Sequence, residues 1–147
     1  MEEEAFPFDA DCIKAEKIAL HLIARAEQSV AGLTAKLEKR GVDASIARQV
    51  ISSLLHRKLL DDTRYAERWI RAHLGAKKPL SPLWFRVSLE KKGIKREISL
   101  NATKKILDEE TEFLLLLKFI EKNGLSRTKL RYEGFSTEVI NRFFDSE

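Results

Sequence analysis

Apolar residues recur along the chain at the three-to-four-residue spacing of amphipathic helices. Near the N-terminus this spacing predicts a first helix over about residues 13–27. A second helix begins after Ser29, whose hydroxyl group can cap it, and ends at Gly41. A third helix follows from about Ala44. These three helices form the first predicted unit.

The following stretch repeats this order. The pair Asp61-Asp62 precedes a fourth helix, which either carboxylate can cap, and the apolar face of this helix carries Tyr65 and Trp69. Both aromatic residues are therefore predicted to pack in the core. The pair Ser81-Pro82 combines a capping residue with proline at the first helical position, and it predicts a fifth helix that ends at Gly93. A sixth helix completes the second unit.

A third unit begins with the acidic residues 108–112, which suit a helix N-terminus, and its first helix ends at Gly124. A shorter helix around residues 126–133 and a last helix from about Thr137 follow. The prediction is an all-α protein with three tandem three-helix repeats. The predicted parts are an acidic N-terminal tail with Phe6 and Phe8 (1–11), repeat 1 (12–58), a basic repeat 2 (59–107) and repeat 3 (108–147).

One six-residue motif supports the division into repeats. The segment Leu37–Val42 reads LEKRGV, and the segment Leu89–Ile94, fifty-two residues later, reads LEKKGI. A fainter copy, LRYEGF, occupies Leu130–Phe135. In each copy an amphipathic helix ends in basic residues, which suit the negative end of the helix dipole, before a glycine stop. A period of this length is typical of a supersecondary unit copied along the chain.

Composition narrows the class of protein. The single cysteine, Cys12, excludes an internal disulfide and fits a reducing cytoplasm, where we expect the protein to be located. The most apolar run, residues 113–120, is interrupted by Lys118 and is far shorter than the roughly 20 apolar residues of a membrane span. We therefore expect no membrane association. A repeat array of this kind is expected to be a monomer.

The positive charge is concentrated in the middle of the chain. The whole chain has a net charge of +4, but residues 71–105 contain 10 Lys and Arg against 2 Asp and Glu. Such a block is typical of a surface that binds a polyanion or an acidic partner. The alternative is a solvated helix face whose acidic counterparts lie on neighbouring units.

Eight residues of this block are the candidate partner-binding or DNA-binding residues. Trp84 lies beside an inward-facing position, so it can either pack against the adjacent unit or be partly exposed and stack on a partner or a base. The basic candidates occupy a loop and two helices that we expect to share one edge. The full set is Lys77, Lys78, Trp84, Arg86, Lys91, Lys92, Lys95 and Arg96.

No catalytic constellation is apparent in the sequence. The three histidines are scattered and make no metal-ligand spacing with a carboxylate or with Cys12, and no glycine-rich phosphate loop is present. Capping explains Asp61-Asp62 better than metal binding does. We therefore expect no enzymatic activity, no metal and no cofactor.

Three segments together resemble the RecX regulatory proteins of bacterial homologous recombination. They are Arg25–Ser29 with Leu33 and the first glycine motif, Leu60–Ala66 (LDDTRYA), and Leu89–Ile94. The resemblance spans about residues 15–144 and implies an elongated, curved array of three three-helix repeats. Two positions depart from the family pattern. Gly32 stands where the family often has an acid that completes a capping box, and Ser126 stands where the first two repeats have Leu33 and Phe85.

The resemblance also implies a function. RecX-like proteins bind the RecA recombinase, chiefly its filament on single-stranded DNA, and modulate its ATP hydrolysis and strand exchange, mainly by inhibition, in recombination, DNA repair and the SOS response. The family implies no sharply defined site, so no residue roles follow beyond the motif positions. A stand-alone helical module that binds single- or double-stranded DNA is the alternative, since three-helix units can resemble helix-turn-helix domains. A plain helical scaffold for another acidic protein is a third possibility, and it predicts neither DNA nor filament binding.

Overall fold

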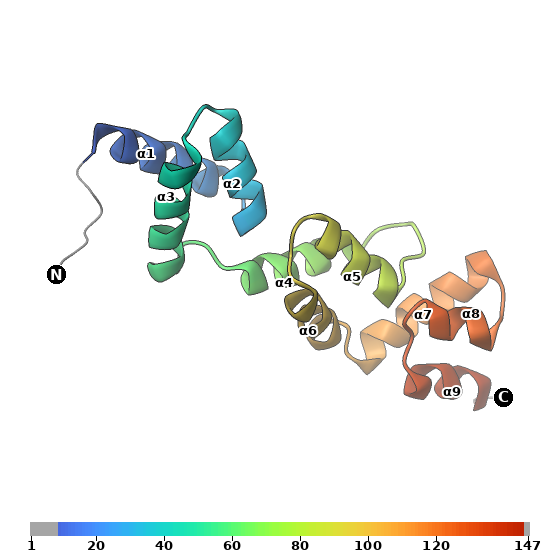
Figure 1. Ribbon diagram of the computed structural model, residues 1–147. Helices are drawn as coiled ribbons and strands as arrows, with labels where there is room; N and C mark the ends of the chain where they lie inside the picture. The colour runs from blue at the N-terminus through green and yellow to red at the C-terminus, as the bar shows by residue number, and fades with distance from the viewer. Residues whose placement is uncertain (1–8, 146–147) are drawn as a thin grey trace. The chain divides into compact units, whose positions relative to one another are not determined.

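The computed structural model describes residues 9–145, and within this range all regular secondary structure is helical (Figure 1). The predicted all-α class is confirmed, and the order of the helices follows the predicted pattern. The described helices are α1 (Ala10–Arg25), α2 (Val30–Lys39), α3 (Ala44–His56), α4 (Asp62–His73), α5 (Pro82–Lys91), α6 (Arg96–Ile106), α7 (Glu109–Asn123), α8 (Arg127–Tyr132) and α9 (Thr137–Asp145).

The three copies of the glycine motif have the same backbone geometry. Each glycine has a positive φ angle, between 86° and 91°, which glycine adopts without steric cost. In the second copy the Gly93 N–H donates to the Glu90 carbonyl at 2.9 Å, and the Ile94 N–H donates to the Leu89 carbonyl at 3.1 Å. The first and third copies make the corresponding pairs of hydrogen bonds. The motif is therefore a Schellman helix stop, with an apolar residue on each side of the turn.

The predicted N-caps of α2 and α5 are confirmed. The Ser29 hydroxyl accepts a hydrogen bond from the Gly32 N–H at 3.0 Å. The Ser81 hydroxyl accepts from the Trp84 N–H at 3.1 Å, with Pro82 at the first position of α5. At α7 the capping residue is Asp108, which accepts from the Thr111 N–H at 2.9 Å and lies at the acidic helix start that the sequence predicted.

The first helix begins earlier than its apolar pattern indicated. It spans Ala10–Arg25 and not 13–27, because the Asp9 carboxylate accepts from the Asp11 N–H and caps the chain there. The helix ends at Arg25 because Ala26 has an extended backbone. Residues 10 and 11 of the predicted tail therefore belong to α1, while residues 1–8, with Phe6 and Phe8, lie outside the described residues.

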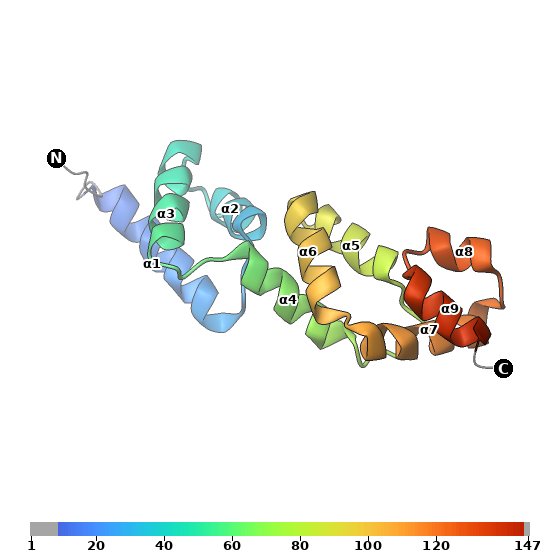
Figure 2. The ribbon, with the colours of Figure 1, turned by 90° about the horizontal axis from the view of Figure 1, so that it is seen from below.

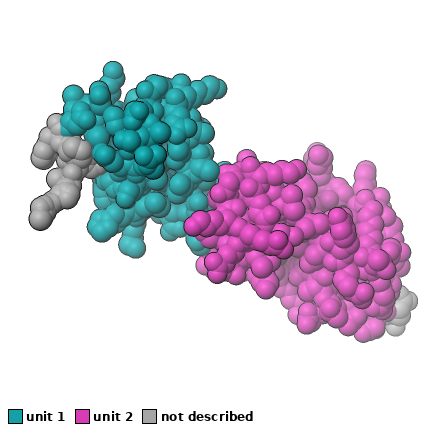
Figure 3. Space-filling model, viewed as in Figure 1, with its two compact units in different colours: residues 1–65 teal, residues 66–147 magenta. Residues whose placement is uncertain are grey.

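The chain divides into two compact units, residues 1–65 and 66–147, and the boundary falls within α4 (Figure 3). In the first unit α1, α2 and α3 pack against one another around a core that includes Leu33, Leu37 and Val50. In the second unit α5 packs on α6, and α9 packs on both α7 and α8 (Figure 2). The division into repeats 12–58, 59–107 and 108–147 stays a prediction.

The LDDTRYA motif ties the start of α4 to the rest of the first unit. Asp61 caps α4 by accepting from the Arg64 N–H at 3.1 Å, so the first of the two aspartates is the cap. Asp62 instead accepts from the Val30 N–H at 2.8 Å, at the start of α2. Arg64 forms an ion pair with Glu27 at 3.0 Å. Position 32 has no capping acid, and the acid at the N-terminus of α2 is supplied by Asp62.

The third repeat differs from the others because its second helix is shorter. Ser126, aligned with the buried residues Leu33 and Phe85, accepts from the Lys129 N–H at 3.3 Å and is the N-cap of α8. The helix therefore begins about one turn later relative to its glycine stop. Leu130, in its last turn, is fully buried and provides its core contact.

Candidate partner-binding surface

Aromatic side chains of α4 and α5 form a cluster on the second unit. The rings of Trp69 and Trp84 are stacked, with centroids 5.5 Å apart and planes at 20°. His73 lies one helical turn after Trp69, and its ring centroid is 4.0 Å from that of Trp69 and 6.0 Å from that of Trp84. Phe85 packs edge-on against both tryptophans and is fully buried. The cluster therefore has a buried base and, at Trp84, a residue that is 38% exposed.

Trp69 is not the simple core residue that its helix pattern predicted. It is only partly buried, as is Tyr65, and its stacking partner Trp84 is exposed. Trp69 and His73 were not among the predicted site residues. Their four-residue spacing places both on one face of α4, and this spacing is the signal in the sequence that could have identified them.

Four of the predicted basic residues lie around the turn that joins α5 to α6. Lys91 ends α5, Lys92 is its C-cap, Lys95 is the N-cap of α6, and Arg96 is its first residue. All four are exposed. The ammonium group of Lys92 lies 5.8 Å from the centroid of the Trp69 ring. Lys92 therefore lies beside the aromatic cluster that contains Trp84. Trp69 of α4 links the two, because it contacts Lys92 and stacks on Trp84.

The other predicted basic residues lie elsewhere on the unit. Lys77 and Lys78 are exposed in the segment before α5, whereas Lys91 lies at the far end of this ten-residue helix, roughly 15 Å along its axis. Arg86 is two residues after Trp84, which is roughly 200° around the helix, so it points away from the cluster. That these residues share one edge stays a prediction. Among the predicted cations of residues 9–145, Lys92 is the one whose ammonium group contacts the aromatic cluster.

Most of these cations have no acidic counterpart among the described residues. Arg86 forms an ion pair with Glu90 at 2.9 Å, one turn later on the same helix. Within residues 9–145, the remaining predicted cations form no ion pair, which leaves their positive charge available to a partner. These cations are Lys77, Lys78, Lys91, Lys92, Lys95 and Arg96.

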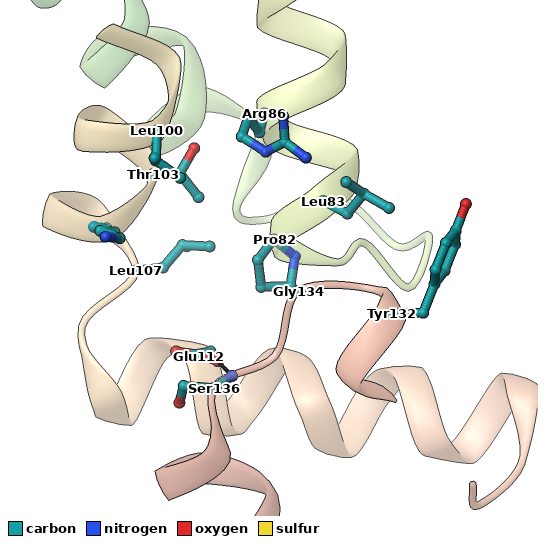
Figure 4. Close-up of a pocket in the computed structure, with 11 residues that line it drawn as sticks. Pro82, Leu83, Arg86, Leu100, Thr103, Leu107, Glu112, Tyr132, Gly134 and Ser136 are labelled. Carbon is teal, nitrogen blue, oxygen red and sulfur yellow. Dashed lines mark hydrogen bonds between the residues drawn. The ribbon is translucent and has the colours of Figure 1, made fainter. Parts of the chain in front are cut away.

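Arg86 instead lines a hollow on another part of the second unit (Figure 4). The hollow has a volume of about 260 Å³ and lies between α5, α6, α7 and the turn between α8 and α9. Pro82, Leu100 and Leu107 form much of its apolar wall, and the Glu112 carboxylate accepts from the Ser136 N–H at one side (Figure 4). Burial is the main reason that the pKa of Glu112 is raised, and nearby Glu138 and Glu109 raise it further.

Side chains that could bind a metal ion are not gathered in the described part of the chain. Among residues 9–145 no group of three or more His, Cys, Asp or Glu side chains could hold a metal ion. Cys12 is 1% exposed, as its predicted packing role requires, and its thiol donates to the Gln49 side-chain oxygen at 3.3 Å. Burial raises the pKa of the thiol, and Asp9 and Asp11 add to this effect. None of the helices in the described range is long and apolar enough to cross a membrane.

The fold and this surface define a class of protein: an all-α helical-repeat protein with a basic, aromatic-bearing surface on its second unit. Residues 15–54 match the family model described as RecX, first three-helix domain. The chain is 30% identical over 135 residues to the Regulatory protein RecX of Treponema pallidum (strain Nichols), covering 92% of this chain and 77% of the relative. The chain belongs to the RecX family of regulatory proteins.

Other relatives and solved structures agree with this family. The Regulatory protein RecX of Mycolicibacterium smegmatis is 34% identical over 86 residues, which is 58% of this chain and 45% of the relative. The crystal structure of RecX from Lactobacillus salivarius matches with a TM-score of 0.74 and 20% identity, covering 92% of this chain and 95% of that one. A second crystal structure, of regulatory protein RecX, has a TM-score of 0.72 and 21% identity, covering 92% of this chain and 72% of that one. The two structures support the fold.

Proposed function

We propose that this protein binds the RecA recombinase filament on single-stranded DNA and lowers the filament's ATP hydrolysis and strand exchange. In this proposal it is located in the cytoplasm and acts in recombination, DNA repair and the SOS response. Membership of the RecX family supports this proposal. The relatives are named regulatory proteins, which supports a role without catalysis by the chain itself. The single observation that carries the proposed contact surface is the group of cations at the α5–α6 turn, which form no ion pair within residues 9–145.

A nucleoprotein filament offers both acidic protein surface and phosphate groups to such cations. Lys91, Lys92, Lys95 and Arg96 lie within six residues of one another and are all exposed. We assign these four residues, with Trp84, to the contact with the filament. Lys77 and Lys78 lie at the other end of α5 and form a second, separate contact in this proposal.

The direct test is DNA-dependent ATP hydrolysis by the RecA protein of the same organism while this protein is titrated in. We expect inhibition at amounts below one molecule per recombinase. The double variant Lys91→Glu/Lys92→Glu should need roughly tenfold more protein for the same inhibition, since two attractive charges become repulsive. Unchanged inhibition by the folded double variant would remove these residues from the contact surface.

The first repeat supplies a matched control for this variant. Lys39 and Arg40 occupy the same positions in the first glycine motif that Lys91 and Lys92 occupy in the second, and both are exposed. Lys39→Glu/Arg40→Glu therefore makes the same charge change at the same end of a helix, with the same penalty from the helix dipole. We expect this control to inhibit the recombinase like the wild type.

A stand-alone nucleic-acid-binding module is the second candidate, and the same unpaired cations favour it. It predicts tight binding to bare DNA whose affinity falls steeply with salt, in the absence of any recombinase. Binding measured at two salt concentrations separates the candidates. Strong, salt-sensitive binding to bare DNA without any effect on ATP hydrolysis would replace the recombinase proposal with the module.

A further inference from the structure

The aromatic cluster of α4 and α5 has features that the proposed charge contact does not explain. Protein–protein and phosphate contacts through lysine do not require a pair of stacked indole rings. A fully buried Phe85 supports the rings from below, while Trp84 is 38% exposed. A large aromatic side chain held in a fixed orientation and open to solvent provides a flat surface for stacking at little cost in conformational entropy.

Charge identifies the kind of ligand that fits the cluster. The Lys92 ammonium group lies 5.8 Å from the Trp69 ring, and Lys91 lies seven residues after Trp84, which places it on the same side of α5. Neither lysine has an ion-pair partner among the described residues. A ligand that matches both features has a flat π-face and a negative group next to it.

The acids near the cluster are mostly engaged elsewhere. Glu67 of α4 pairs with Lys105 at 3.2 Å, and Glu90 of α5 pairs with Arg86 at 2.9 Å. The other acid of residues 71–105 is Glu97, in the first turn of α6. The field at the stacked rings is therefore dominated by lysines, which favours an anionic ligand over an aromatic residue of a neutral peptide.

We propose that Trp84, stacked on Trp69, is a binding site for an unpaired base of single-stranded nucleic acid, with Lys91 and Lys92 binding the flanking phosphates. Single strands fit because every unpaired base has a free π-face, whereas the bases of a duplex cover one another. A role of this site in regulating the recombinase rests on the proposed function. The binding of single-stranded nucleic acid does not depend on it, and this binding can be tested on bare oligonucleotides without any recombinase.

The test compares two oligomers of equal length and charge, about 15 nucleotides long. One is oligothymidylate and the other is an abasic strand with the same phosphates. The chain has two tryptophans, and both belong to the cluster, so stacking should quench its intrinsic fluorescence. We expect thymidylate to quench it and to bind about 5- to 150-fold more tightly than the abasic strand. Equal binding and equal quenching by the two strands would overturn the proposal.

Two substitutions separate stacking from simple packing, with affinities measured by anisotropy of labelled oligomers. Trp84→Phe keeps an aromatic face and should retain most of the preference for thymidylate. Trp84→Leu keeps an apolar side chain without a π-face and should bind both strands equally. The control Tyr132→Leu removes a 75% exposed tyrosine of α8 that makes no ring contact with Trp69 or Trp84, and it should not change the preference. If Trp84→Phe and Trp84→Leu behave alike, the site is not a stacking site.

The lysines are tested by the salt dependence of the same binding. Each phosphate contact to a single strand contributes about 0.7 to the slope of log affinity against log salt. We expect Lys91→Gln and Lys92→Gln each to lower the slope by about this amount, while Lys39→Gln leaves it unchanged. A failure of base discrimination would leave the recombinase proposal standing, and a failure to affect the recombinase would leave base stacking intact.

Discussion

The Ser81 hydroxyl donates a hydrogen bond to the Glu133 carboxylate at 2.7 Å, although fifty-two residues separate them in the chain. The same oxygen accepts from the Trp84 N–H and caps α5. The backbone carbonyl of Glu133 accepts from the Leu83 N–H at 2.9 Å. Ser81 is 2% exposed, so these hydrogen bonds replace contacts with water that burial has removed.

In the first unit an acidic side chain also binds the start of a helix, but it bonds to different atoms. There Val30 follows the capping serine, and its N–H donates to the Asp62 carboxylate at 2.8 Å. In the second unit Pro82 occupies this position and has no N–H, so the acidic residue is bonded by the serine hydroxyl instead. In both units an acid from a later segment binds the start of the second helix, where the positive end of the helix dipole favours it.

Ser81 and Glu133 are therefore expected to be energetically coupled. Ser81→Ala removes the cap and leaves the Glu133 carboxylate without its donor, which should lower the free energy of unfolding by about 1–2 kcal/mol. A double-mutant cycle with Glu133→Ala, measured by urea unfolding, should give a coupling energy of about 0.5–3 kcal/mol. Ser126→Ala, which removes only the cap of α8, is the control. Strictly additive effects would show that the bond contributes nothing.

Gly134 and Gly41 provide a second comparison. Both have a positive φ angle, 91° and 86°, so alanine should cost about 1–2 kcal/mol at either position. An added Cβ at Gly41 would have no neighbour within 4 Å, whereas at Gly134 it would lie 3.1 Å from the Leu83 nitrogen. We expect Gly134→Ala to destabilise the protein more than Gly41→Ala does. Thermal unfolding of the two variants tests this, and equal losses would mean that α5 shifts at no cost.

Glu112 predicts how stability changes with pH. Its pKa is raised in the folded protein, chiefly by burial, so folding favours the protonated form. The resulting stabilisation is fully present below the ordinary pKa and is lost as the pH rises through the raised pKa. Glu112→Gln keeps an oxygen for the Ser136 N–H without the charge. It should therefore be more stable than the wild type at neutral pH, and the difference should shrink as the pH falls to about 4, near the ordinary pKa of a glutamate.

Melting temperatures at several pH values measure this difference directly. Glu121→Gln is a suitable control, because Glu121 is an exposed residue of the same helix and its neutralisation makes the same change in net charge. A difference between wild type and Glu112→Gln that grows as the pH falls would contradict the prediction.

Cys12 should be unreactive in the folded protein. It is 1% exposed, its thiol is bonded to Gln49, and its raised pKa lowers the fraction of reactive thiolate. We expect a disulfide reagent to label it at least about 100-fold more slowly in native protein than in denaturant, because labelling requires local opening. An exposed cysteine introduced by Ala35→Cys in a Cys12→Ala background gives the reference rate. Rapid native labelling would show that α1 opens readily.

The sequence by itself determined the features that depend on neighbouring residues. The caps at Ser29 and Ser81 and the three glycine stops were predicted because each is formed by hydrogen bonds within about six residues. The first helix was misplaced by three residues at its start because its apolar spacing begins after its cap, Asp9. The all-α class was predicted from this local information. The resemblance to the family also rested on short motifs, which form helix caps, glycine stops and the junction before α4.

Tertiary structure alone decided which of the candidate residues lie together. The basic block is continuous in sequence, but the turns of α5 place Arg86 away from Trp84, and the length of that helix separates Lys78 from Lys91. Trp69 was predicted as core because its spacing is apolar, and only the packing of α4 against α5 stacks it under Trp84 beside Lys92. Likewise, the pairing of Ser81 with Glu133 exists only once α8 has folded back towards α5. Such contacts depend on the relative positions of whole helices, which local periodicity does not determine.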